Sequence, residues 1–144
     1  MHEINMVFTI EELVKLISCC DQSIIDGEER IRTTGNITFT SHNFTIKDSL
    51  NKVWTIKNKF KSSIIDHAGN GSKSENIHIK MDISDIIKIK VCCNSVITAN
   101  QKIIDILGTE SKISASLIRE NQFIDEIKDK IKRILNNYYL VIPG

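Results

Sequence analysis

The sequence predicts an α+β domain in which antiparallel strands bury one face beneath an amphipathic helix near the C-terminus. Short stretches between residues 77 and 118 alternate apolar and polar side chains, as half-buried strands do. A later stretch carries apolar residues at helical spacing, namely Phe123, Ile127, Ile131 and Leu135. These two patterns together predict a core formed between a set of strands and one closing helix.

Length and composition are those of an ordinary globular protein. The chain has 144 residues, which is the usual size of one domain. We expect one domain over residues 1–144, with a helical extension at 1–27, a strand-rich body at 28–137 and a tail at 138–144. The formal net charge is +1, so no overall field favours nucleic acid. No apolar run approaches the roughly 20 residues that span a bilayer, and no secretory signal is evident, so we expect a cytoplasmic protein.

The first helix has a clear start signal. Thr9 and Glu12 have the spacing of a capping box, in which each side chain pairs with the other residue's backbone amide. A broad apolar stripe follows, and we expect this helix to end near Cys20 or Asp21. Gly27 then suits a turn.

Strands are expected through most of the remaining chain. Residues 28–46 favour a hairpin turning at 41–43, and residues 66–76 form a loop rich in turn formers. Residues 47–65 fit either a helix or a strand, and their β-branched and aromatic residues favour a strand. Further strands are expected at 77–83, 87–91, 96–98, 103–107 and 112–118. The closing helix is expected over 121–137, with Asn121 as its N-cap.

This order of elements is similar to the pleckstrin-homology-like superfold, especially the small bacterial PH and GRAM-type families. Three stretches resemble family features: residues 35–46 the early hairpin, residues 79–91 the strand–corner–strand in the middle, and residues 123–135 the capping helix. The likeness covers about residues 28–137. It implies a partly open antiparallel β-barrel plugged by the C-terminal helix, with the N-terminal helix as an extension. It also implies a binding module whose early loops meet lipid head groups or whose surface binds a protein.

A basic cluster is the candidate ligand site. Lysines alternate with aromatic residues over a short stretch, and the candidate ligand-binding residues are Lys52, Trp54, Lys57, Lys59 and Lys61. Such a cluster can meet the phosphates of an anionic lipid surface while its aromatic residue enters the interface. It could equally meet a nucleic-acid backbone. The structural alternative is a solvated strand face whose aromatic residues belong to the core.

The cysteines and histidines indicate no metal or cofactor. Cysteines occur as two adjacent pairs, at 19–20 and 92–93, without the two-residue gap of a metal knuckle. Buried reduced thiols explain them best. An enzyme using His78 with Cys92 or Cys93 is an alternative that a depressed thiol pKa would favour. Asp82 and Asp85 suit turn capping better than acid–base catalysis.

The sequence therefore favours a non-enzymatic binding module with no catalytic residues. We expect it to engage either an anionic, phosphate-bearing ligand such as a lipid head group or a partner protein. The alternative is a small inhibitor, immunity or chaperone-like protein that acts by docking on another protein. An exposed strand edge offers one route to such docking, because another chain can add a strand to it.

Overall fold

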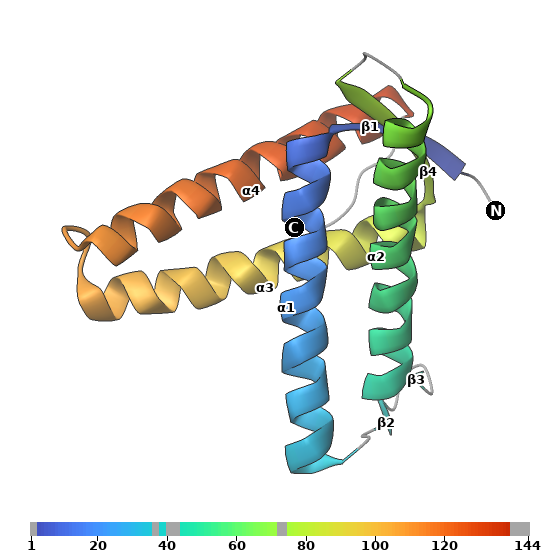
Figure 1. The fold of residues 1–144 in the computed structure, drawn as a ribbon. Helices are drawn as coiled ribbons and strands as arrows, with labels where there is room; N and C mark the ends of the chain where they lie inside the picture. The colour runs from blue at the N-terminus through green and yellow to red at the C-terminus, as the bar shows by residue number, and fades with distance from the viewer. Residues whose placement is uncertain (1–2, 36–37, 40–43, 72–74, 139–144) are drawn as a thin grey trace.

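Two long helical hairpins cross beside a two-stranded ribbon in the computed structural model, which describes residues 3–35, 38–39, 44–71 and 75–138. The elements in chain order are β1 (Glu3–Thr9), α1 (Ile10–Thr34), β2 (Thr38–Phe39), β3 (Phe44–Thr45), α2 (Ile46–Gly69), β4 (Asn76–Asp82), α3 (Ile83–Leu107) and α4 (Lys112–Asn137). Figure 1 shows α1 beside α2, and α3 and α4 forming a second arm that extends across them. The short strands β2 and β3 lie in the connection from α1 to α2 and pair with each other.

The two halves of the chain repeat one unit of strand, helix and helix. Strands β1 and β4 both have 7 residues, and helices α1 and α3 both have 25. Their N-caps, Thr9 and Asp82, lie 73 positions apart, and each accepts a hydrogen bond from the amide three residues on. Their C-caps, Gly35 and Gly108, lie the same distance apart and both have positive φ, near 80°. The cysteine pairs at 19–20 and 92–93 keep this offset.

The second helices of the two units correspond as well. Their buried residues follow the same spacing, which aligns Val53, Ile56 and Phe60 of α2 with Ile124, Ile127 and Ile131 of α4. Equivalent polar contacts also recur: Lys57 reaches Asp21 at 2.5 Å, and its counterpart Lys128 reaches Asn94 at 2.5 Å. The molecule is therefore an internal pseudo-dimer.

The ribbon joins the two units. Strands β1 and β4 are antiparallel, and Met6 pairs with its own counterpart, Ile79, at the centre of the register. An approximate twofold axis therefore passes between these two residues. Alternate ribbon residues are buried against the helices, namely Ile4, Met6, Phe8, Ile77, Ile79 and Met81.

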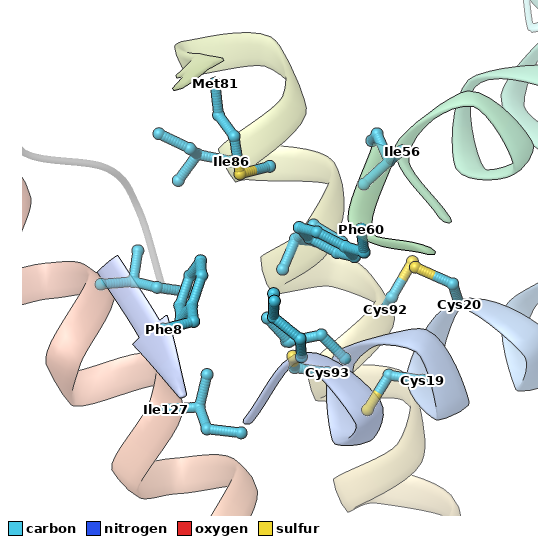
Figure 2. Packing of buried hydrophobic residues seen from close by; sticks show 14 of the residues in the cluster. Phe8, Cys19, Cys20, Ile56, Phe60, Met81, Ile86, Cys92, Cys93 and Ile127 are labelled. Atoms are coloured by element: carbon cyan, nitrogen blue, oxygen red, sulfur yellow. The ribbon is translucent and has the colours of Figure 1, made fainter. Parts of the chain in front are cut away.

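The core lies where the ribbon meets the crossing of α1 and α3. Phe8 of β1 packs edge-on against Phe60 of α2, with ring centroids 6.4 Å apart and an interplanar angle of 81°. Figure 2 shows these rings beside the buried thiols that α1 and α3 bring together. Apolar surface from all four helices and from strands β1 and β4 is thus removed from water in one contiguous cluster.

The predicted PH-like barrel is wrong. The described residues hold one pair of seven-residue strands and one pair of two-residue strands, and neither closes a barrel. The segments expected as strands at 47–65, 87–91, 96–98, 103–107 and 112–118 are helical. Apolar and polar residues alternate over short stretches of α3. Over the whole helix, however, Ile86, Ile89, Cys93 and Val96 recur at helical spacing and are buried. The β-branched side chains of Ile86, Ile89 and Val96 pack as well on a buried helix face as in a strand, so strand propensity misleads here.

Several individual predictions are confirmed. The capping box of Thr9 and Glu12 is present, with Glu12 N to Thr9 Oγ1 at 3.1 Å and Thr9 N to Glu12 Oε1 at 2.8 Å. The strand expected at 77–83 is β4, and the last helix ends at Asn137. However, α1 continues to Thr34 through the strand expected at 28–32, and α4 begins at Lys112 rather than near Asn121. The expected turn at 41–43 and most of the tail at 138–144 lie outside the described residues.

Candidate anion-binding pocket

The candidate lysines do not share one face, because 47–65 is helical. Lys52 and Lys59 point towards α3, where their ammonium groups lie 3.4 Å and 3.8 Å from the carboxylate of Asp85. Lys57 points towards α1, where it pairs with Asp21, and its ammonium lies 4.6 Å from the centre of the Trp54 ring. Three of the lysines thus bind carboxylates of this chain. Lys61 is exposed, and Trp54 is 42% exposed.

A pocket of about 170 Å³ lies instead between α1, α2 and α3. Its polar lining residues are Ser23, Asp26, Arg30, Ser49, Lys88, Cys92 and Ser95. Leu50 and Val53 add apolar surface from α2. These side chains come from segments up to about 70 residues apart, so only the packing of the two units brings them together.

Lys88 carries a partly buried positive charge into this pocket. Its ammonium donates to the Ser49 hydroxyl at 2.7 Å. Among the residues that the structure describes, no carboxylate lies within ion-pair distance of Lys88. Asp26 also lines the pocket, but its carboxylate accepts a hydrogen bond from Gln22 at 3.0 Å. A partly desolvated ammonium with only a hydroxyl partner favours binding of an anion.

The equivalent place in the other half of the molecule is filled by a carboxylate. Lys15, the counterpart of Lys88, lies 3.1 Å from Glu120, which occupies the position of Ser49. Asn100 donates to Glu120 at 2.8 Å and to Asn121 at 2.9 Å. The hydrogen bond from Asn100 and the nearby ammonium of Lys15 lower the pKa of Glu120. The carboxylate is therefore held ionised beside the lysine.

Gly27 explains why the first half lacks this network. It is the counterpart of Asn100, and a Cβ atom there would lie 2.4 Å from Cδ2 of Leu50. Leu50 in turn stands at the position of Asn121. One half therefore has an amide, a carboxylate and an ammonium, whereas the other has a glycine, a hydroxyl and an ammonium beside an open pocket.

Cys92 forms part of the pocket wall and has an activated thiol. The Cys20 thiol donates to the Cys92 sulfur and, with Ser23 and the ammonium of Lys88, lowers the pKa of Cys92 to about 7 despite burial. The same hydrogen bond raises the pKa of Cys20. All four cysteines are buried and free, as the sequence indicates.

The proposed pairing of His78 with Cys92 or Cys93 is not formed. His78 lies on the exposed face of the ribbon, where its Nδ1 is 3.1 Å from Nδ2 of Asn5. The thiols are buried where α1 crosses α3. Asp82 acts as a capping residue, because it accepts a hydrogen bond from the Asp85 amide at 2.8 Å at the start of α3.

Fold and site together define a mainly helical pseudo-dimer with a pocket between α1, α2 and α3 that has polar side chains in its wall. Comparison with family models, with curated proteins and with solved structures gave no significant match. Within the described ranges, no three or more His, Cys, Asp or Glu side chains converge as a metal site requires. None of the described helices is both long and apolar enough to cross a bilayer.

Proposed function

We propose that the chain is a non-enzymatic binding module and that the pocket beside Lys88 takes the anionic group of a small phosphate- or carboxylate-bearing ligand. The observation that supports this most is internal to the molecule: a carboxylate stands beside Lys15 where only the Ser49 hydroxyl stands beside Lys88. The ligand would supply the negative charge that Glu120 supplies in the other half.

The other pocket residues suit the same chemistry. Ser23 and Ser49 offer hydroxyl donors, and Arg30 at the exposed rim offers a guanidinium that pairs well with planar or tetrahedral anions. Asp26 opposes anion entry by Coulomb repulsion, which restricts the anion to the Lys88 side of the pocket. A volume of about 170 Å³ admits a phosphate or carboxylate group but not a large ligand.

The test is titration of the full chain with inorganic phosphate and, separately, with acetate, followed by amide chemical shifts and calorimetry. We expect saturable binding with shifts centred on Ser49 and Lys88. Lys88→Met should weaken binding by about tenfold to a hundredfold, because a charge-assisted hydrogen bond contributes about 1.5–3 kcal/mol. Lys15→Met is the matched control, because it removes the equivalent lysine beside the filled position and should leave the affinity unchanged.

A second variant separates binding from stability. Ser49→Glu places in the pocket the carboxylate that the other half already has, so it should abolish anion binding while the protein stays folded. Phosphate binding that survives both Lys88→Met and Ser49→Glu would contradict the proposal. Vesicles containing phosphatidic acid distinguish a lipid head group from a free anion. Sedimentation with such vesicles that persists in Ser49→Glu, with no binding of free phosphate, would favour the lysines of α2.

The tip of the α3–α4 arm favours a second function, self-association. Ile106, Leu107 and Ile113 are 82%, 46% and 60% exposed there. The positions in α1 that match Ile106 and Leu107 hold Thr33 and Thr34, so the fold does not need apolar residues at this place. Apolar side chains that gather on a surface mark interaction sites.

A second copy of this chain is the partner that fits the arm tip best. Exposed charges of both signs flank the apolar residues, namely Lys102, Asp105, Glu110 and Lys112. Two copies related by a twofold axis can place each sign against the other. We expect sedimentation velocity to show a dimer that Ile106→Asp dissociates and that Thr33→Asp leaves intact. A monomer at all concentrations would exclude this second function.

A further inference from the structure

The four cysteines form two equivalent thiol pairs across the crossing of α1 and α3. Cys20 donates a hydrogen bond to Cys92, and Cys93 donates one to Cys19. The approximate twofold axis exchanges the two pairs, because Cys19 corresponds to Cys92 and Cys20 to Cys93. Figure 2 shows the side chains of Cys20 and Cys92 meeting between the two helices. Each pair therefore joins one half of the molecule to the other.

The two acceptor thiols, Cys92 and Cys19, have different surroundings. Cys92 lines the pocket of about 170 Å³ together with Ser23 and Lys88, although its side chain is only 2% exposed. Cys19 lies at the equivalent position in the other half, where Glu120 and Asn100 fill the corresponding space. The pKa of both acceptor thiols is lowered, but the charges beside them differ: Lys88 favours a thiolate at Cys92, whereas at Cys19 the ammonium of Lys15 favours a thiolate and the carboxylate of Glu120 opposes it. The two pairs thus have the same contacts but differ in access and in charge.

We propose that Cys92 is a peroxide-reactive thiol and that Cys20 resolves it, giving a disulfide that links α1 to α3. The Cys92 thiolate attacks one oxygen of a hydroperoxide, and the O–O bond breaks. The product is a sulfenic acid at Cys92 and, after proton uptake, water or an alcohol. The Cys20 sulfur then attacks the Cys92 sulfur, the S–O bond breaks, and water leaves with the Cys20 proton. The two thiols lose two electrons in total and the peroxide gains them.

The contact between the thiols makes this sequence favourable. A resolving thiol that already meets the first sulfur between the two helices needs little backbone movement to form the disulfide (Figure 2). The Cys20 thiol gives up its proton less readily than Cys92, so the attack on peroxide falls to Cys92 and resolution to Cys20. Lys88 contributes through its positive charge, and Ser23 through its hydrogen bond to the sulfur.

The test treats the folded, full-length protein with hydrogen peroxide and maps disulfides by non-reducing peptide mass spectrometry. We expect a Cys20–Cys92 link to form at least tenfold faster than a Cys19–Cys93 link. In Cys20→Ser, a sulfenic acid at Cys92 should persist and be trapped by dimedone. Cys93→Ser is the matched control and should leave the Cys20–Cys92 reaction intact.

The pH dependence gives a second readout. Alkylation of Cys92 by iodoacetamide should rise with pH around 7, and Lys88→Met should move that rise to higher pH. Equal rates for both pairs, or oxidation only under conditions that also unfold the protein, would overturn the proposal. Its outcome is separate from that of the anion proposal, because Cys20→Ser removes the resolving thiol but leaves the pocket residues Ser49 and Lys88 unchanged.

Discussion

The two halves of this chain have the same design but treat one position differently. Beside Lys15 the molecule places the carboxylate of Glu120, supported by Asn100. Beside Lys88 it places only the Ser49 hydroxyl, with Gly27 behind it. A feature present in both halves, such as the helix caps, belongs to the fold. A feature that differs, such as the open pocket, is free to serve a function, and the pseudo-symmetry supplies an internal control for it.

The largest effects are expected in the core, where Phe60 and Ile131 occupy matching positions in the two halves. Phe60→Ala removes the ring that packs against Phe8 and should cost about 4 kcal/mol, whereas Ile131→Ala at the matching position should cost about 3 kcal/mol. Urea denaturation measures both values. A negligible effect of either variant would show that its half contributes little to the common core.

The glycine behind the pocket gives the next largest effect. Gly27→Ala places a methyl group against Leu50, so overpacking of about 1–3 kcal/mol should exceed the gain in helix propensity of about 1 kcal/mol. Gly69→Ala is the control, because nothing lies within 4 Å of a Cβ there. That variant should be neutral or slightly stabilising. Thermal unfolding of both variants checks the prediction, and a stabilised Gly27→Ala would mean that Leu50 moves aside freely.

The filled position should show a moderate, pH-dependent effect. Glu120→Gln removes the charge that pairs with Lys15, and since both side chains are partly exposed we expect a loss of about 1 kcal/mol at neutral pH. The lowered pKa of Glu120 means that its stabilisation is present above about pH 4.3, the value of a free glutamate. It is lost as pH falls through the lower folded-state value. The variant and the parent protein should therefore converge in stability in acid, and a constant difference down to pH 2 would contradict this.

The smallest expected difference in stability concerns the equivalent lysines Lys57 and Lys128. Lys57→Met removes a pairing with Asp21 and a contact with the Trp54 ring, whereas Lys128→Met removes a hydrogen bond to the neutral Asn94. We expect losses of about 1 and about 0.5 kcal/mol. Added salt should reduce the first loss more than the second, and chemical denaturation at two ionic strengths measures this.

Local signals in the sequence predicted local structure well. The capping box at Thr9 and the alternation of residues 77–83 both identified real elements. The topology failed because strand propensity was read in short windows, although α3 buries isoleucines along one helical face over 25 residues. A longer window, with Asp82 and Asp85 read as a helix cap, would have shown that face.

The repeat itself was visible in the sequence. The spacing of Thr9 and Glu12 recurs in Asp82 and Asp85, and each pair is followed at the same distance by two adjacent cysteines. This signal would have predicted the pseudo-dimer. The pocket could not be predicted in this way, because no local sequence pattern shows that Lys88 of α3 lies beside Ser49 of α2. That contact arises only when the two arms cross.

The pairing of Met6 with its own counterpart suggests how such a molecule arose. Two identical polypeptides of half this length would pair their strands in this same register, around a true symmetry axis. Every residue of such an ancestor would occur twice, so the cavities beside the two equivalent lysines would both be open or both be filled by a side chain. Joining the two copies in one gene lifts that restriction. One half can then keep the carboxylate that fills its cavity, as Glu120 does, while the other half has a smaller side chain there, as Ser49, and an open pocket.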